Sequence, residues 1–196
     1  MQESFVMSRN FDSQVLVKTF LSAAQQAFAL TSGKVVPTDD ATHKTQNIIE
    51  YQGRMSVTGM DKFNGPTYIV GVSFFLNEQD RDKRRAKGAM VLYLEASNAE
   101  KILRGFGHPI SDDDEDEETF TAYGKVCTTL ADKFKESLAQ SGYPSLVLSV
   151  PVSSKNSLPE GIDFSSDQTQ KQEISFYFWK KKALVVDLTM ADLSRR

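Results

Sequence analysis

The chain has 196 residues, of which 40% are hydrophobic and 25% are charged, and its formal net charge is −3. This composition is typical of an ordinary folded domain, and the negative charge argues against a general nucleic-acid binder, which needs excess positive charge to displace counterions. No apolar run approaches the length of a membrane span, and the N-terminus lacks the pattern of a secretory signal. The sequence therefore predicts a cytoplasmic protein with neither a nucleic-acid nor a membrane partner.

Cysteine and histidine are too scarce to build a metal centre. Cys127 is the single cysteine, which excludes an intramolecular disulfide, and it falls in the apolar phase of a predicted helix. His43 and His108 have no partners at the spacing of zinc ligands. We therefore expect a buried Cys127, no metal and no cofactor.

The first half of the chain predicts one helix followed by strands. The helix runs from Asp12, a plausible N-cap, to Gly33, and apolar residues recur along it at helical spacing. Residues 48–51 and 55–59 are predicted to form a hairpin around 52–54. The strongest strand signal is 68–76, which alternates between two faces. Residues 89–94 are expected to be its antiparallel neighbour, across the charged loop 80–87.

Two polar features separate the halves. Ser97 and Glu100 have the spacing of a capping box and predict a short helix that ends at 105–107. Seven consecutive acidic residues follow at 112–118, and their mutual repulsion predicts a solvated loop that abuts the next helix. Calcium binding is an alternative function for this run, but the ligand spacing and turn glycine of an EF-hand are missing.

The second half repeats the order of helix and then strands. A helix is predicted over 120–141, stopped by Gly142 and Pro144, and a strand over 146–152. A long polar loop is expected over 153–172. The last element is a hairpin of 174–179 and 183–190 around three lysines, with Trp179 packed against the sheet.

This order predicts an α+β fold: a twisted antiparallel sheet with two long helices on one face. We expect a single domain over residues 1–196, built from two pseudo-repeated halves at about 12–107 and 118–192. The terminal hairpin is rich in Phe, Tyr and Trp. Because exposed edge strands are templates for pairing, a homodimer is also predicted.

Several segments carry a resemblance to a known family. They are the helix frame Gly124-x3-Thr128, the segment Ser149-Val150-Pro151, and the pattern Gly59…Val70-Gly71-Val72-Ser73. With the order of elements, they resemble the CheX/CheC family of chemotaxis phosphatases, most closely its longer uncharacterised bacterial CheX-like members. The resemblance spans most of the chain and implies a CheC-like fold.

The resemblance also implies a partner, the receiver domain of a response regulator. In the family, a glutamate on the helix reaches the regulator's active-site lysine, and an asparagine three residues later orients water for attack on the aspartyl phosphate. These positions are Lys125 and Thr128 here. Lysine reverses the sign of the first contact, and threonine lacks the amide that donates and accepts at once.

The leading hypothesis is a chemotaxis- or signalling-associated protein that binds a response regulator through Lys125, Thr128, Thr129 and Asp132, with phosphatase activity lost or altered. One alternative is an active aspartyl-phosphate phosphatase that uses Thr128 with Thr129 or Asp132. Another is an oligomeric scaffold outside chemotaxis. The simplest hypothesis is that Lys125 and Thr128 only form a solvated face of the helix.

Overall fold

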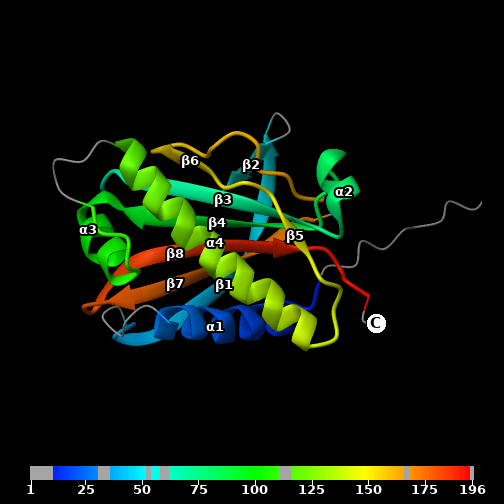
Figure 1. Ribbon diagram of the computed structural model, residues 1–196, viewed down its shortest axis with the longest axis horizontal. Coiled ribbons are helices and arrows are strands. Elements are labelled where there is room, and N and C mark those ends of the chain that lie inside the picture. Colours follow the sequence, from blue (N-terminus) through cyan, green and yellow to red (C-terminus); the bar gives the residue numbers. More distant parts are fainter. Residues whose placement is uncertain are drawn as a thin grey trace, which may run out of the picture.

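The computed structural model describes residues 11–30, 36–51, 54–57, 62–110, 116–165 and 168–194, with the side chains of 49–51 and 54–57 left out. These residues form one antiparallel sheet with its helices on one face (Figure 1). The helices are α1 (Ser13–Leu30), α2 (Glu78–Asp82), α3 (Ala96–Gly105) and α4 (Asp116–Gln140). The strands are β1 (Asp39–Tyr51), β2 (Arg54–Val57), β3 (Thr67–Phe75), β4 (Gly88–Glu95), β5 (Val147–Leu148), β6 (Val152–Lys155), β7 (Gln170–Phe178) and β8 (Lys181–Met190). Their order in the sheet is β2-β1-β7-β8-β4-β3-β5, and β6 also pairs with β3.

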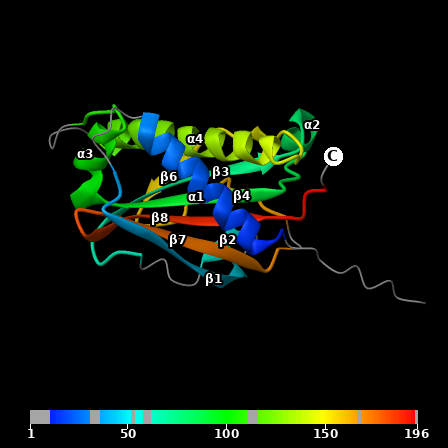
Figure 2. The ribbon, with the colours of Figure 1, turned by 90° about the horizontal axis from the view of Figure 1, so that it is seen from below.

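The two long helices cross the same face of the sheet, as predicted (Figure 2). Their apolar stripes meet the side chains that β3 turns toward them, Val70, Val72 and Phe74. The ring of Phe134 on α4 lies 5.7 Å from that of Phe20 on α1 and 5.6 Å from that of Phe74. Each such buried side chain contributes about 1.5–3 kcal/mol relative to an exposed one. This aromatic layer fixes α4 on the sheet.

The opposite face of the sheet carries a smaller apolar cluster and a group of buried charges. Ile69, the other face of β3, packs there with residues of β4 and β8. Beside them lie Lys62, Lys171, Glu173 and Asp187, which we call the ion cluster. The side chains of Lys171 and Asp187 are fully buried and their charged atoms are 2.6 Å apart. Lys62 bonds both Glu173 and Asp187.

The start of two helices differs from the prediction. Ser97 is not an N-cap: α3 begins at Ala96, and the Ser97 hydroxyl donates to Glu95 instead. Helix α4 begins at Asp116, so the last three acids of the run are its first turn rather than loop. Acidic side chains there are favourable against the helix dipole, which outweighs their mutual repulsion. Residues 112–115 of the run lie outside the described residues.

The segment after α4 is also organised differently from the prediction. The expected strand 146–152 is broken into β5 and β6 by 149–151, where Pro151 has no amide hydrogen to donate. The connection predicted over 153–172 is shorter in the structure at both ends, because β6 extends to Lys155 and pairs with β3, and β7 already begins at Gln170. Gly142, with a φ of 86°, ends α4 as predicted.

The hairpins are confirmed with changed positions. β1 and β2 pair as expected, but β1 begins as early as Asp39. The sequence did not predict this early start, because the first residues of β1 are mostly polar and show no apolar alternation. The charged connection between β3 and β4 contains the short helix α2. The terminal hairpin of β7 and β8 lies inside the sheet rather than at its edge. The predicted helix end at Gly33, the turn residues 52–53 and Gly59 lie outside the described residues.

Candidate functional site

The residues that carry the family resemblance come together at one open groove. Helix α4 forms one wall, and the segment that leads into β6 forms the other (Figure 1). The groove has a volume of about 740 Å³. Its lining residues are His108, Glu117, Phe120, Thr121, Gly124, Lys125, Thr128, Thr129, Pro151 and Ser153. The sequence-predicted Lys125, Thr128 and Thr129 are all among them.

Gly124 and Pro151 set the distance between the two walls. A Cβ atom at Gly124 would lie 3.7 Å from the Pro151 Cβ, so the proline ring sits directly against the helix at this point. Ser149 fixes the segment to β3, because its hydroxyl accepts from the Ser73 amide at 2.9 Å and its amide donates to the Ser73 carbonyl at 2.9 Å. Val150, between Ser149 and Pro151 in the chain, is 81% exposed. The wall therefore presents an apolar side chain to solvent beside the groove.

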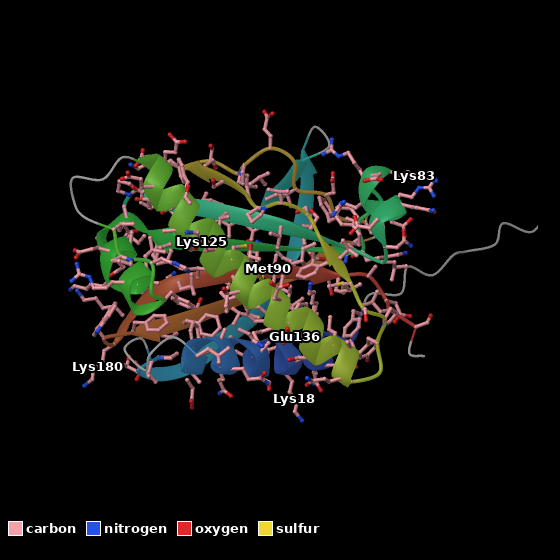
Figure 3. All side chains as sticks on the ribbon, in the orientation of Figure 1. Lys18, Lys83, Met90, Lys125, Glu136 and Lys180 are labelled. Carbon is pink, nitrogen blue, oxygen red and sulfur yellow. The ribbon has the colours of Figure 1, made fainter. Side chains whose placement is uncertain are left out.

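Lys125 is exposed on the helix face that lines the groove (Figure 3). His108, half-buried in the connection that follows α3, lines the same groove and the adjoining hollow of about 650 Å³. Burial and the nearby charge of Lys125 lower the pKa of His108 from its usual 6.5. An imidazole and an ammonium group thus share this end of the groove with the carboxylate of Glu117.

The two threonine hydroxyls are already committed as donors. Thr128 donates to the carbonyl of Gly124 at 3.0 Å, and Thr129 to the carbonyl of Lys125 at 2.9 Å. Threonine in a helix commonly bonds the carbonyl four residues earlier in this way. Each hydroxyl keeps only its lone pairs for a water molecule. Neither can supply both a donor and an acceptor to orient a water for attack.

Asp132 lies apart from the other predicted site residues. It is half-buried one turn beyond Thr128, does not line the groove, and pairs with Lys135 at 2.8 Å. The structure therefore brings Lys125, Thr128 and Thr129 to one surface and leaves Asp132 outside it.

The first turn of α4 is tied to the sheet by a small polar network. Asp116 accepts from the Tyr68 hydroxyl at 2.7 Å and from the Lys155 ammonium at 2.8 Å. The hydrogen bond from Lys155, followed by that from Tyr68, lowers the pKa of Asp116. The ring of Phe120 stands edge-on to Tyr68, with centroids 5.6 Å apart. These contacts fix the entrance of the groove.

Sequence reasoning missed four lining residues that carry polar groups: His108, Glu117, Thr121 and Ser153. His108 was set aside because it had no partners at metal-ligand spacing, and Glu117 was assigned to a loop. The two sequence segments that did indicate this surface were the helix frame Gly124-x3-Thr128 and the segment Ser149-Val150-Pro151. Among the described residues, no group of three or more His, Cys, Asp or Glu side chains is placed to hold a metal ion. None of the described helices is long and apolar enough to cross a membrane.

No family model matches the chain, and no curated protein matches it in sequence. Solved structures do match. A CheC-like superfamily protein from Shewanella sp. PV-4 matches with a TM-score of 0.58 and 12% identity, over 93% of this chain and 100% of its own. A chain of the CheX–CheY–BeF3–Mg²⁺ complex from Borrelia burgdorferi matches with a TM-score of 0.53 and 17% identity, over 90% of this chain and 98% of its own. Thermotoga maritima FliY matches with a TM-score of 0.57 and 12% identity, over 90% of this chain and 86% of its own. The chain therefore has the CheC-like fold that its sequence resembles.

Proposed function

We propose that this protein binds the receiver domain of a response regulator through the groove beside α4 and does not accelerate loss of the regulator's aspartyl phosphate. The observation that carries the proposal is the make-up of the groove. The family's frame residues Gly124 and Pro151 form its walls, whereas Lys125 and Thr128 occupy the positions of the family's reactive pair.

Support for binding comes from the shape and exposure of the surface. The groove is open along α4, and Val150, which directly precedes the lining residue Pro151 in the chain, is 81% exposed. A protein of the same fold was solved in a CheX–CheY complex. Apolar side chains that become buried at an interface often dominate its affinity. Val150 is therefore the side chain that we expect a receiver domain to cover.

Support for lost catalysis comes from the side chains themselves. Lys125 places a positive charge where the family uses a carboxylate to contact a lysine. The hydroxyl hydrogens of Thr128 and Thr129 are held by helix carbonyls. Asp132, the remaining candidate for an alternative phosphatase, is paired with Lys135 and lies off the groove. None of the sequence-predicted site residues is therefore placed to position an attacking water in the groove.

The binding half of the proposal is tested with isolated CheY-type receiver domains from the same genome, titrated calorimetrically with and without beryllofluoride. We expect Val150→Asp to weaken binding about tenfold or more, because the variant would bury an unpaired carboxylate at the interface. The matched control is Leu30→Asp, which alters an exposed apolar residue at the C-terminal end of α1. It should leave the affinity within about twofold. Absence of binding to every receiver domain, or equal loss in both variants, would contradict the proposal and favour a scaffold outside chemotaxis.

A further inference from the structure

Exposed apolar side chains gather at one end of the molecule, away from the groove. Among the described residues, four large hydrophobic side chains are exposed, and three of them are Leu30, Val36 and Trp179, at 68%, 63% and 45%. Leu30 ends α1, Val36 precedes β1, and Trp179 begins the turn between β7 and β8. Figures 1 and 2 both show these element ends at the same side of the molecule, next to α3.

Hydrogen bonds and a ring contact hold these segments together. The Thr38 hydroxyl, just after Val36, accepts from the Lys180 amide at 2.9 Å, and the Thr38 amide donates to the Tyr177 carbonyl at 2.8 Å. The ring of Phe28 lies 5.7 Å from that of Phe178, the neighbour of Trp179. The exposed apolar residues therefore lie on segments that contact one another. We call Trp179, Lys180, Lys181 and the adjacent Lys101 the hairpin tip.

The hairpin tip is positively charged in a protein whose net charge is −3. The Lys101 ammonium lies over the Trp179 ring, 5.6 Å from its centroid. Lys180 points outward (Figure 3), and Lys180 and Lys181 are exposed. No ion pair joins Lys101, Lys180 or Lys181 to a carboxylate in the described part of the chain. The local charge is thus free to attract an acidic group.

The turn at the hairpin tip is not built from residues that favour its conformation. Trp179 and Lys180 have φ values of 51° and 60°, a left-handed pair that Asn-Gly or Gly-Gly adopt most readily in two-residue hairpins. A bulky side chain in this region is uncommon. The sequence predicted that Trp179 packs against the sheet, but it lies in the turn and is 45% exposed, although its ring lies 6.0 Å from that of Phe178. The tryptophan occupies a strained position and remains half-exposed.

A hollow beside the hairpin tip fits a small apolar side chain. It has a volume of about 660 Å³ and is lined by Phe28, Val36, Pro37 and Phe176, with Asp39 and Asp40 also on its wall. Both aspartates are exposed. These two carboxylates reduce the net positive charge around the hairpin tip, which disfavours a broad polyanion such as a nucleic acid or an anionic membrane.

We propose that the hairpin tip docks a short acidic segment of a partner protein. Carboxylates of the segment pair with Lys180, Lys181 and Lys101, and an apolar side chain covers Trp179 or enters the adjacent hollow. Complementary charge steers such a segment to the tip, and the exposed indole supplies the apolar contact that gives affinity. This surface is separate from the α4 groove, so the inference does not depend on the proposed function.

Trp179 makes the test direct because it is the single tryptophan of the chain. The full chain is titrated with a synthetic peptide of Glu and Asp around one Leu and one Phe, and with its Gln and Asn counterpart, while indole emission is followed. The acidic peptide should give a saturable shift of the emission to shorter wavelength that weakens as salt is added, and the neutral peptide should not.

Charge reversal locates the contact without removing the reporter. Lys180→Glu with Lys181→Glu should weaken binding of the acidic peptide about tenfold, as expected for several surface ion pairs changed from attraction to repulsion. The matched control is Lys83→Glu with Arg85→Glu, which lies at the other end of the molecule, where Figure 3 labels Lys83. It should change the affinity by less than about twofold. No emission change with the acidic peptide, or equal weakening in both double variants, would overturn the proposal. A shift produced only by phosphatidylglycerol vesicles or by a single-stranded oligonucleotide would overturn it as well.

Discussion

Lys125 is the residue on which the functional reading of this protein depends. On a receiver domain docked as in the family, its ammonium group would approach the active-site lysine of the partner. Two such charges about 4 Å apart at a partly exposed interface repel by on the order of a few kcal/mol before screening. The family's productive complex therefore requires either a different residue here or an anion between the two lysines.

The charge of Lys125 should be measurable through His108. Because burial and the Lys125 charge both lower the pKa of His108, Lys125→Glu is expected to raise it. The chain has two histidines, so one pair of imidazole resonances can be followed by NMR while His43 on β1 serves as the internal reference. An unchanged His108 titration in the variant would show that the two side chains do not interact.

The same shift sets a pH dependence of stability. The pKa of His108 is lower in the folded chain than its ordinary 6.5, so the unfolded chain binds the proton more readily. The stabilisation from His108 is complete above pH 6.5 and is lost as the pH falls through the folded value. In Lys125→Glu, unfolding by urea should lose less free energy between neutral pH and about pH 5 than in the native chain. An equal loss in both proteins would contradict this account.

Two glycines give opposite predictions for the same substitution. Gly124→Ala places a Cβ at ordinary contact distance, 3.7 Å from Pro151, and should stabilise the helix by about 0.5–1 kcal/mol. Gly88→Ala places a Cβ 2.3 Å from the carbonyl oxygen of Thr189, a backbone atom, and should destabilise the fold. Urea unfolding of both variants tests the pair. A destabilised Gly124→Ala would mean that the helix and Pro151 are closer than the groove geometry requires.

At the residue level, the sequence predicted those site residues that belong to a spaced pattern. Lys125 and Thr128 were found because the helix frame Gly124-x3-Thr128 and the family resemblance single them out, and Cys127 was correctly expected to be buried. His108 was not found because it lies outside this helix, whereas its neighbours in the groove, Glu117 and Lys125, lie on it. Spacing within one helix does not show which residues outside the helix lie beside it.

Among the elements, the face of the sheet opposite the helices carries the least expected feature, the ion cluster of Lys62, Lys171, Glu173 and Asp187. Burial lowers the pKa of Lys171 to about 8 despite the neighbouring Asp187. Burial by itself would raise the pKa of Glu173, but the hydrogen bond and charge of Lys62, with a smaller part from Lys44, bring it below the usual value. Each of these buried groups therefore depends on its oppositely charged neighbours to favour its charged form.

Removing one charge from the ion cluster should cost more than removing a pair. Asp187→Asn leaves two buried lysines with one carboxylate and is expected to destabilise the fold by about 3–5 kcal/mol. Lys171→Met with Asp187→Leu keeps the Lys62–Glu173 pair and replaces the other by apolar groups, so it should cost clearly less. Chemical denaturation of the two variants decides between these outcomes. A double variant at least as unstable as Asp187→Asn would mean that the cluster's hydrogen-bond geometry matters more than its charge balance.

Elements with a strong apolar period were predictable, and polar elements were not. The alternation of β3 predicted that strand to within one residue at each end, and the stripe of α1 predicted the start and the buried face of that helix. The first residues of β1 are polar on both sides, so the pairing of 39–47 with β7 could not be foreseen. The break at Pro151 and the helical start at Asp116 depend on contacts with β3 and Lys155 that local sequence does not contain.

At the scale of the whole molecule, β1 rather than the terminal hairpin offers the free strand edge through which the predicted homodimer would pair. The aromatic terminal hairpin is central in the sheet, whereas β1 pairs with β7 on one side and reaches β2 only over residues 48–51 on the other. In the described part of the chain, the outer edge of 39–47 therefore has no strand partner and offers a template for pairing. Light scattering should give about twice the 21.9 kDa chain mass at micromolar concentration. A mass that stays at the monomer value across that range would reject the dimer.

The duplication of the two halves remains a prediction of the sequence. The helix-then-strands order of α1 to β4 is repeated by α4 to β8, and both long helices lie on one face of the sheet. Only the second half brings together the frame of glycine, threonine and Ser-x-Pro at a groove. Binding of a receiver domain is therefore expected at α4 rather than at α1.

Decay of a phosphorylated receiver domain tests the central claim most directly. The regulator that binds this protein is phosphorylated, and its decay is followed alone, with the native protein, and with Lys125→Glu plus Thr128→Asn. The account predicts that the native protein leaves the decay rate unchanged and that the double variant accelerates it, because only the reactive pair has been lost from an intact groove. Slow decay with the double variant would show that the docking surface has diverged as well. Rapid decay with the native protein would contradict the account outright.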